Sequence, residues 1–244
     1  MALRPQLDLR AITYHRVIDR EPDPDRGESP GLFVTTRQLQ ENLDAMRAGG
    51  FRTLTQADVV RTIETGRQPQ KRAVVITFDD GYKEMLETVA PALLARRMRA
   101  TFFVITSRLG RREFLSADGV KKLAGYGFDV GGHTRRHADL AGVSEPDLTE
   151  EVAGCRDDLR DILGEPPLAF AYPRGLHDAA AVNAVRAAGF RAAYTTVPGR
   201  CTTRGLALLL PRLHVRRGLS GRGLIEQLEQ AEPVARAHTL HGVR

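Results

Sequence analysis

Short apolar runs alternate with helical patterns along most of this 244-residue chain, and no other feature restricts its fold as strongly. The run Ala73–Phe78 (AVVITF) is apolar on both faces, as in a strand buried within a barrel or a parallel sheet. Segments with the apolar spacing of a helix separate such runs. Strands and helices in this rhythm form β/α units, so the chain predicts an α/β fold around a parallel sheet or barrel.

The expected elements follow from this rhythm and from the glycines, prolines and capping residues between them. Residues 19–31, rich in proline, aspartate and glycine, predict an exposed loop, and the length suits one domain spanning 1–244. We expect strands at 11–14, 51–54, 73–78, 100–105, 128–130, 168–172, 190–195 and 207–215. We expect helices at 36–48, 56–64, from Gly81 to about 96, and at 116–126, 145–163, 178–188 and 219–230.

The composition is that of an ordinary globular protein and excludes several functional classes. The net charge is +6, but the 36 basic residues are scattered without a long run, which indicates a solvated surface instead of a nucleic-acid site. No apolar stretch is long enough to predict a membrane span or a secretory signal. Cys155 and Cys201 form no CxxC pair. We therefore expect a cytoplasmic protein, although a secreted chain trimmed of its signal would show the same pattern.

Asp79 and Asp80 come directly after the buried run 73–78 and precede Gly81. Adjacent carboxylates on an extended backbone point in different directions, so one can bind a cation while the other faces a substrate. Asp-Asp-Gly is also a common turn at the end of a strand, and these residues alone do not separate the two interpretations. In a β/α barrel, the carboxyl ends of the strands are where active sites assemble.

His133 and His137 form the second candidate group, in the string GGHTRRH. On one helical turn, side chains four residues apart point the same way, which suits a single metal ion. Two imidazoles and one carboxylate are a common catalytic zinc set, and the same ligands could hold Fe(II). Gly131 and Gly132 predict a close approach of the backbone to another group. Two surface histidines would show the same spacing, so this pattern is specific only together with the aspartates.

Three motifs in this order resemble the polysaccharide deacetylase family, the NodB homology domain of carbohydrate esterase family 4. They are ITFDDGY at 76–82, HTRRH at 133–137 and FAYPRG at 170–175. Two further strings resemble a subgroup of poly-N-acetylglucosamine deacetylases with an N-terminal YHxV motif: TYHRV at 13–17 and LPRLHV at 210–215. The resemblance covers about residues 11–230, and it implies a distorted (β/α)7 barrel.

The resemblance also implies a metal-dependent hydrolase that removes N-acetyl (or O-acetyl) groups from a carbohydrate, with N-acetylhexosamine units as the expected substrate. Asp80, His133 and His137 match the family's metal ligands. Zn²⁺ is the expected ion, with Co²⁺ or Ni²⁺ as alternatives. Asp79 matches the base that takes a proton from the attacking water, and a cation beside it would keep that carboxylate ionised.

The third motif departs from the family's usual pattern. Arg174 stands where the family has tyrosine, and its backbone N–H matches a donor to the oxyanion, which a change of side chain does not remove. Tyr172 and Pro173 of this motif, with Tyr82, are the residues expected to bind substrate. Aromatic residues are only 6% of the chain, so few side chains are available to stack on a sugar.

The general acid has two candidates. The family's DxxDW motif is missing because the chain contains no tryptophan. In the YHxV subgroup the acid is the motif's histidine, which matches His15, and His214 is the alternative. Arg212 matches an arginine of the subgroup's late motif and could orient Asp79. A core histidine at position 15 and a surface arginine at position 212 are the structural alternatives.

Two other functions remain compatible with the sequence. One is a metal-dependent amidohydrolase of the same fold that acts on a small glycoside or a non-sugar amide, which the altered acid motif favours. The other is a relative that binds carbohydrate without turnover, which the intact metal and base positions disfavour. The sequence leaves the oligomeric state open.

Overall fold

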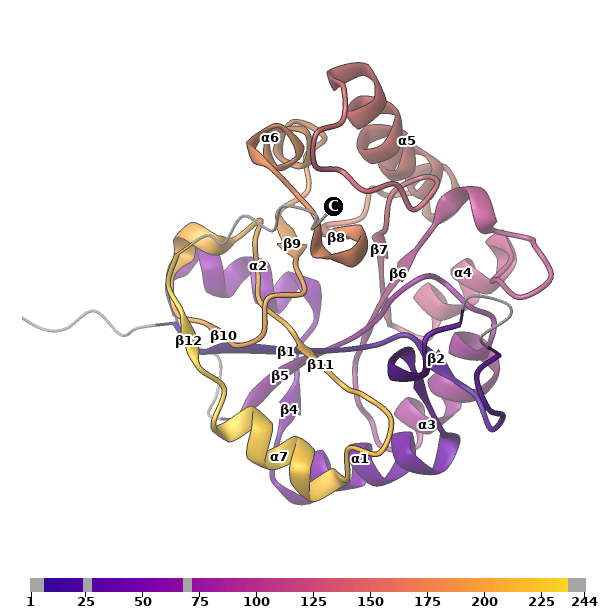
Figure 1. Ribbon diagram of the computed structural model, residues 1–244, viewed down its shortest axis with the longest axis vertical. Coiled ribbons are helices and arrows are strands. Elements are labelled where there is room, and N and C mark those ends of the chain that lie inside the picture. Colours follow the sequence, from indigo (N-terminus) through magenta and orange to yellow (C-terminus); the bar gives the residue numbers. More distant parts are fainter. Residues whose placement is uncertain (1–6, 24–27, 68–71, 237–244) are drawn as a thin grey trace, which may run out of the picture.

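The centre of the molecule is a curled sheet, shown in Figure 1 for a computed structural model that describes residues 7–23, 28–67 and 72–236. Six strands run parallel in the order β1-β5-β6-β7-β8-β9. Because they are parallel, their carboxyl ends meet at one end of the sheet. They are β1 (Leu9–Tyr14), β5 (Ala73–Phe78), β6 (Thr101–Val104), β7 (Asp129–Gly132), β8 (Ala169–Ala171) and β9 (Ala192–Tyr194).

The segment that begins at Leu210 closes this sheet into a barrel. Leu210 forms a parallel bridge with Tyr194, and β11 (Leu213–His214) pairs in parallel with β1. The last expected strand, 207–215, therefore consists of two short pairings and supplies the seventh strand position. The predicted α/β fold, a distorted (β/α)7 barrel, is confirmed. Three short strands extend the main sheet: β4 (Arg52–Thr53) pairs with β5, β10 (Arg200–Cys201) with β1, and β12 (Pro233–Val234) with β10. A separate two-stranded sheet consists of β2 (Arg16–Val17) and β3 (Phe33–Val34).

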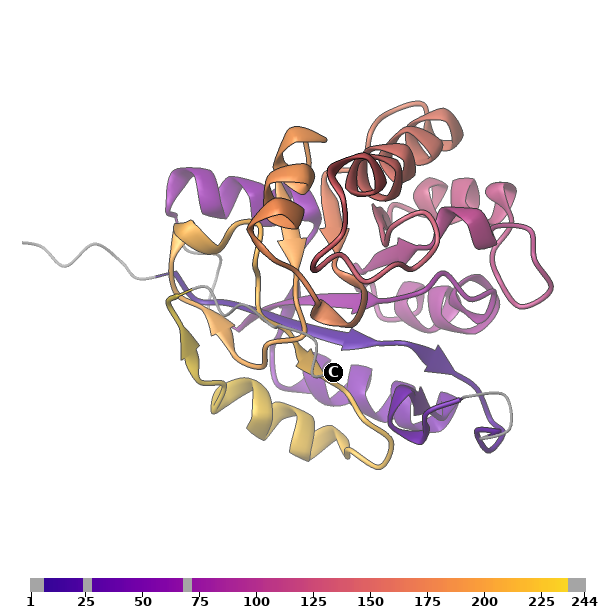
Figure 2. The same cartoon turned by 45° about the horizontal axis from the view of Figure 1, so that its top comes forward.

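The helices surround the sheet, and α1 lies beside α7 while α5 lies beside α6 (Figures 1 and 2). Except for α3, each helix begins after a capping side chain, for example Thr35 or Ser144, which accepts a hydrogen bond from an amide in the first turn. They are α1 (Thr36–Ala48), α2 (Gln56–Thr65), α3 (Ala90–Leu94), α4 (Ala117–Gly125), α5 (Glu145–Leu163), α6 (Ala179–Ala187) and α7 (Gly221–Glu229).

The helix expected from Gly81 to about residue 96 differs from the prediction. The chain forms a π-helical stretch at Met85–Val89 and only then the short helix α3. Pro91 has no N–H to donate to the carbonyl four residues earlier, and its ring clashes with that carbonyl, so a continuous α-helix through this point is unfavourable. π-helical stretches are rare, and most are single turns within an α-helix.

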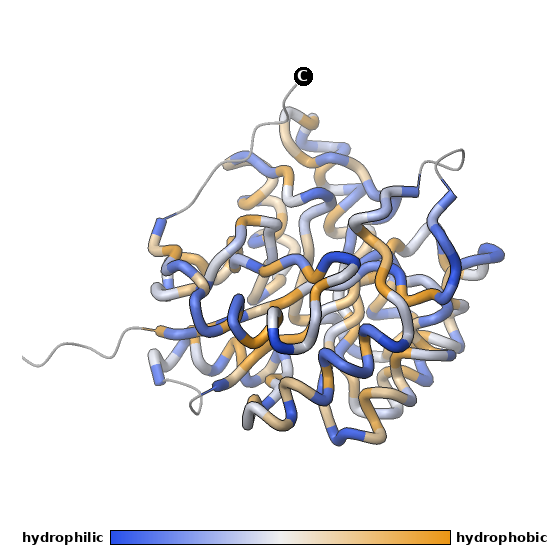
Figure 3. The backbone as a smooth tube through the Cα atoms, turned by 60° about the horizontal axis from the view of Figure 1, so that its bottom comes forward, coloured by the Kyte–Doolittle hydropathy of each residue, from blue (hydrophilic) through white to orange (hydrophobic). Residues whose placement is uncertain are grey.

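The strands alternate between the barrel interior and the helical layer. Along β5, Ala73 and Val75 belong to the interior cluster, whereas Val74 and Ile76 pack with the outer helices. The helices show the complementary pattern, and Figure 3 shows it as alternating orange and blue along their length. The interior is narrow at β7, because a Cβ on Gly131 would lie 2.5 Å from the Phe103 ring. The glycine pair thus permits close packing within the fold, and the predicted close approach is to the protein itself.

Candidate active site

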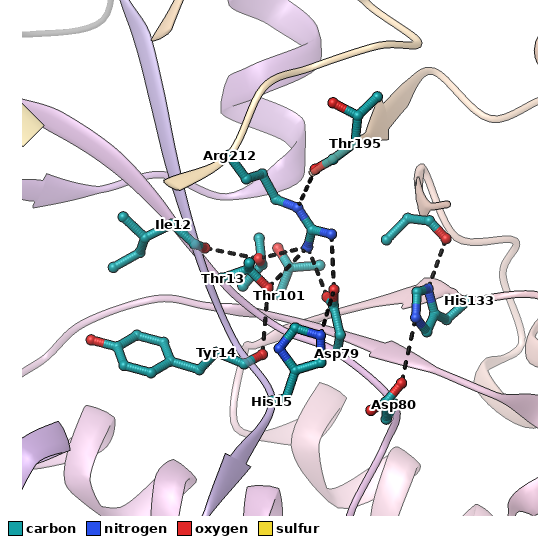
Figure 4. Close-up of polar contacts among 12 residues, drawn as sticks. Ile12, Thr13, Tyr14, His15, Asp79, Asp80, Thr101, His133, Thr195 and Arg212 are labelled. Carbon is teal, nitrogen blue, oxygen red and sulfur yellow. Dashed lines mark hydrogen bonds and ion pairs between the residues drawn. The ribbon is translucent and has the colours of Figure 1, made fainter. Parts of the chain in front are cut away.

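The ends of the parallel strands bring the predicted residues together. His15 follows β1, Asp79 and Asp80 follow β5, and His133 follows β7, and all four side chains face a common region (Figure 4). Of these, only His15 is partly exposed, and the other three are buried. The convergence of distant segments at the carboxyl ends of the strands is the arrangement expected for a β/α barrel site.

Asp80, His133 and His137 form the one group of metal-ligand side chains found among the described residues. Oδ1 of Asp80 lies 3.5 Å from Nε2 of His133 and 3.4 Å from Nε2 of His137. The Nδ1 nitrogen of His133 lies 2.7 Å from the carbonyl oxygen of Ala171. If Nδ1 carries the proton and donates to this carbonyl, Nε2 faces the site with a free lone pair.

The backbone between the two histidines is not helical, so the helical-turn prediction for residues 133–137 is wrong. No helix is assigned there, and both Thr134 and His137 have positive φ values, of 58° and 65°. The two rings nevertheless meet, with centroids 5.0 Å apart. A tight loop, and not the periodicity of a helix, brings the imidazoles to the same carboxylate.

The ligand set fits a tetrahedral divalent ion. An ion about 2.1 Å from each nitrogen and oxygen ligand holds neighbouring ligand atoms about 3.4 Å apart, which is close to the separations from Asp80. The buried Oδ1 atom of Asp80 has no hydrogen-bond partner, an unfavourable state for a buried carboxylate unless a cation compensates it. Burial, followed by the proximity of His133, lowers the pKa of His137 to about 4, which leaves its imidazole neutral and able to bind a metal.

Asp79 forms a buried ion pair with Arg212. The two guanidinium nitrogens donate to the two carboxylate oxygens at 2.7 and 2.8 Å, and both side chains are at most 3% exposed. Burial alone would raise the pKa of the Asp79 carboxyl, but the Arg212 guanidinium holds this pKa below its ordinary value. The pairing suggested for Arg212 is therefore present, and the surface-arginine alternative is wrong.

Three threonines hold the guanidinium of Arg212 in place. Nη1 donates to the hydroxyl of Thr13 at 3.2 Å, and Nε donates to the carbonyl of Thr195 at 3.0 Å (Figure 4). Nη1 also donates to the hydroxyl of Thr77 at 3.0 Å. None of these threonines was among the site residues predicted from the sequence. A signal was present, because Thr13 and Thr77 are each the polar residue of an Ile-Thr-aromatic string and lie opposite one another in β1 and β5.

The two candidates for the general acid lie next to one another, and His15 also lies beside Asp79. Nε2 of His15 is 3.9 Å from Oδ2 of Asp79, and the His15 and His214 rings are 5.0 Å apart. Burial lowers the pKa of His15, an effect that the nearby carboxylates of Asp79 and Asp80 oppose. Burial, followed by the proximity of His15, lowers the pKa of His214 to about 4. His15 is therefore the candidate that lies next to the base.

The motif after β8 contributes a strained turn. Arg174 has a φ of 54°, and its exposed side chain forms an ion pair with Asp139 at the surface. Tyr172 and Pro173 are buried, and the Tyr172 hydroxyl donates to the carbonyl of Leu208. The Tyr172 side chain is therefore packed within the fold, and the expected role of Tyr172 and Pro173 in substrate binding stays a prediction.

Tyr82 also lacks a free face for a sugar ring. The Arg16 guanidinium lies 3.9 Å from the centroid of the Tyr82 ring, and the Phe114 ring stacks on it at 4.8 Å. Arg16 is itself buried and forms an ion pair with Glu84. Both faces of the Tyr82 ring are therefore covered, and the expected role of Tyr82 in substrate binding stays a prediction.

A family model for polysaccharide deacetylases matches residues 66–193, more than half of the chain. The chain belongs to the polysaccharide deacetylase family. This confirms the predicted family and the enzyme class, carbohydrate deacetylase. The matched segment contains Asp79, Asp80, both histidines of the loop and the turn at Arg174, whereas His15, Arg212 and His214 lie outside it.

Individual relatives agree with this membership. YxkH of Bacillus subtilis, whose name places it among polysaccharide deacetylases, is 26% identical over 190 residues, covering 78% of this chain and 68% of the relative. The poly-β-1,6-N-acetyl-D-glucosamine N-deacetylase of Staphylococcus epidermidis is 25% identical over 226 residues, covering 84% and 78%. Among solved structures, the Streptococcus pyogenes deacetylase PplD has the same fold, with a TM-score of 0.84, 23% identity, and coverage of 91% of this chain and 98% of that one.

Among the helices of residues 7–23, 28–67 and 72–236, none has both the length and the apolar character that crossing a bilayer requires.

Proposed function

We propose that the chain is a metal-dependent N-deacetylase acting on carbohydrate that contains N-acetylhexosamine units. The observation that carries this proposal is the cluster of Asp80, His133 and His137 next to the buried Asp79–Arg212 pair. Three protein ligands with nitrogen and oxygen donors are typical of catalytic zinc sites, which keep one position open. Zn²⁺ fits this donor set best, and Co²⁺ or Ni²⁺ are alternatives.

In this proposal Asp80, His133 and His137 hold the ion. A bound divalent ion would lower the pKa of a water toward neutrality and polarise the acyl carbonyl. Asp79 takes the proton from the attacking water, and Arg212 keeps the Asp79 carboxylate ionised and oriented.

The chain also supplies the remaining proton and charge-stabilising groups. His15, 3.9 Å from Asp79, donates a proton to the leaving amine nitrogen, and His214 is the second candidate for this step. The backbone N–H of Arg174, in the turn after β8, stabilises the charge on the former carbonyl oxygen. This use of a backbone donor is consistent with an Arg174 side chain that pairs with Asp139 at the surface.

The proposed substrate class rests on the named relatives. Besides the Staphylococcus epidermidis enzyme, a Bacillus cereus relative, 30% identical over 106 residues, is named a peptidoglycan-N-acetylglucosamine deacetylase. Both names specify N-acetylglucosamine units, so N-acetylglucosamine oligomers are the first substrates to examine. A second candidate is a small glycoside or non-sugar amide, which the covered faces of Tyr82 and the burial of Tyr172 favour over a long sugar chain.

The test measures acetate released from N-acetylglucosamine oligomers of increasing length, with Zn²⁺ or Co²⁺ added to the metal-free protein. We expect metal-dependent release, and a loss of roughly 10²–10⁴-fold in Asp79→Asn, because removal of a general base typically has an effect of this size. Asp161→Asn, a change of the same chemistry at an exposed position on α5, should behave like the wild type.

Full activity of Asp79→Asn would overturn the role of Asp79 as base. Absence of acetate release from every oligomer, by a protein that binds the metal tightly, would overturn the carbohydrate substrate and favour the small-amide candidate. Release that increases with oligomer length would favour a polymeric substrate.

A further inference from the structure

Two of the three residues between the metal-ligand histidines face helix α5. Arg135 and Arg136 occupy the middle of the loop His133–His137, and their side chains form ion pairs with acidic residues of α5. The contact residues Glu151, Gly154 and Asp158 are spaced three and four apart, which places them on one face of the helix. The family motif accounts for His133 and His137 as metal ligands, but it gives no role to the contacts of Arg135 and Arg136 with α5.

Asp158 holds the Arg135 guanidinium with both carboxylate oxygens. Nε and Nη2 of Arg135 donate to Oδ2 and Oδ1 of Asp158 at 2.9 and 2.7 Å, the paired geometry that gives an arginine a fixed orientation. The Thr106 hydroxyl donates to the same carboxylate at 2.6 Å, and the amide of Ser107 donates to the carbonyl of Arg135 at 2.9 Å. The loop is therefore bound to α5 on one side and to the segment after β6 on the other.

Glu151 holds the backbone of the loop as well as a side chain. Its buried carboxylate accepts the amide N–H of Arg136 at 2.8 Å and contacts Nε of Arg136 at 2.7 Å. Its carbonyl accepts the amide N–H of Arg135 at 3.1 Å. Two successive loop amides are thus held directly by one residue of α5.

Gly154 lies against the Arg135 guanidinium. A Cβ at position 154 would lie 2.8 Å from the guanidinium carbon of Arg135. Glycine weakens the interior of a helix, so its presence in the middle of α5 agrees with a requirement for close approach. The loop also contains two non-glycine residues with positive φ, Thr134 and His137, a conformation that persists only when surrounding contacts hold it.

We propose that Asp158 and Glu151 of α5 are positioning residues that set the conformation of the 133–137 loop and thereby the affinity of the site for its metal. The inference rests on the metal site of the proposed function. Without these carboxylates the loop would relax from its strained conformation, and His137 would no longer be held 3.4 Å from the Asp80 carboxylate. The two acidic residues touch neither metal nor substrate and act through the loop alone.

The test compares Asp158→Asn with Asp157→Asn, the same change at the neighbouring residue of α5, where the carboxylate pairs with Arg160 at the surface. Metal affinity is measured by competition with a chromogenic chelator on metal-free protein, at a temperature where circular dichroism shows every variant to be folded. We expect Asp158→Asn to weaken Zn²⁺ binding about tenfold or more, as changes to groups that orient metal ligands do, and Asp157→Asn to match the wild type. Glu151→Gln, tested in parallel, should weaken binding in the same direction.

The visible spectrum of the Co²⁺ protein gives a second readout, because it reports ligand geometry around the ion. We expect the spectrum of Asp158→Asn to differ from that of Asp157→Asn. A lower melting temperature with unchanged metal affinity and unchanged spectrum would show a purely structural role and overturn the inference. Failure of the wild type to bind Zn²⁺ or Co²⁺ would instead overturn the metal site on which the inference depends.

Discussion

At the residue scale, the site depends on backbone conformations that most side chains avoid. Six non-glycine residues of the described part of the chain have positive φ, and four of them lie at the site: Asp80, Thr134, His137 and Arg174. Each such residue costs ~1–3 kcal/mol, so the surrounding contacts must compensate for it. The backbone strain of these positive φ values is therefore concentrated at the candidate active site, where side chains from several strand ends converge.

Replacing Arg212 by lysine tests whether Asp79 needs only a positive charge beside it or also the bidentate contact that holds its carboxylate in place. Arg212→Lys keeps the positive charge but cannot donate to both oxygens of Asp79 and to the threonines at once. We expect the rate constant kcat for deacetylation to fall roughly 10- to 100-fold, because a small displacement of a catalytic group has effects of this size. Steady-state kinetics check this, with Arg37→Lys, an exposed arginine of α1, as the matched control.

The metal affinity of Arg212→Lys should stay within about threefold of the wild type, since Arg212 contacts none of the three metal ligands. Unchanged kcat in Arg212→Lys would contradict the orienting role of the bidentate contact.

At the element scale, the narrow barrel interior limits which residues the strands can carry. Ala169, Ala171 and Ala192 line the interior on β8 and β9, and Gly131 lies on β7 opposite the Phe103 ring. Small residues on these strands let the large ring of Phe103 fit within the barrel. The strand ends that carry His133 and the turn at Arg174 are held together by this packing.

Gly131→Ala should therefore destabilise the protein. The added Cβ would lie 2.5 Å from a ring carbon of Phe103 and 2.7 Å from the carbonyl oxygen of Ala169, so the barrel wall would have to move. We expect the free energy of unfolding to fall by ~1–3 kcal/mol, or more if the backbone cannot move. Urea denaturation measures this. Gly125→Ala, at the end of α4 with no atom within 4 Å of the added carbon, should be neutral or slightly stabilising.

Equal stability of Gly131→Ala and the wild type would show that the interior has more room than the packing against Phe103 implies.

At the scale of the whole molecule, the metal site joins segments that no local interaction connects. The ligands come from the ends of β5 and β7 and from the loop that α5 holds, while β1 and the segment 210–214 supply His15 and Arg212. An ion bound to three of these segments would bind the folded state and not the unfolded chain. Metal binding should therefore stabilise the complete barrel.

Thermal unfolding with increasing Zn²⁺ measures this linkage. At a free metal concentration a hundred times the Kd, binding stabilises the folded state by about 2.7 kcal/mol. For a chain of this length, that corresponds to a rise in Tm of roughly 5–10 °C. His137→Gln, which removes one ligand, should abolish most of the dependence. A Tm that does not respond to metal, or that rises equally in His137→Gln, would contradict binding at this site.

Local patterns in the sequence predicted much of this molecule. The strand 73–78 and the helix 145–163 have their expected bounds, because burial periodicity and capping residues are short-range properties. The aspartates and histidines of the site could be found because their spacing along the chain forms recognisable motifs. The short π-helical interruption at Met85–Val89 was missed, although Pro91 was a signal for a break.

Contacts between distant segments could not be predicted in the same way. The closure of the barrel by two short pairings, the covering of Tyr82 by Arg16 and Phe114, and the attachment of the histidine loop to α5 each join residues far apart in the chain. The sequence by itself determined which elements form and which residues carry the chemistry, since both depend on neighbours within a few positions. Only the tertiary structure decided which side chains face the site, because this depends on how the completed barrel packs around them.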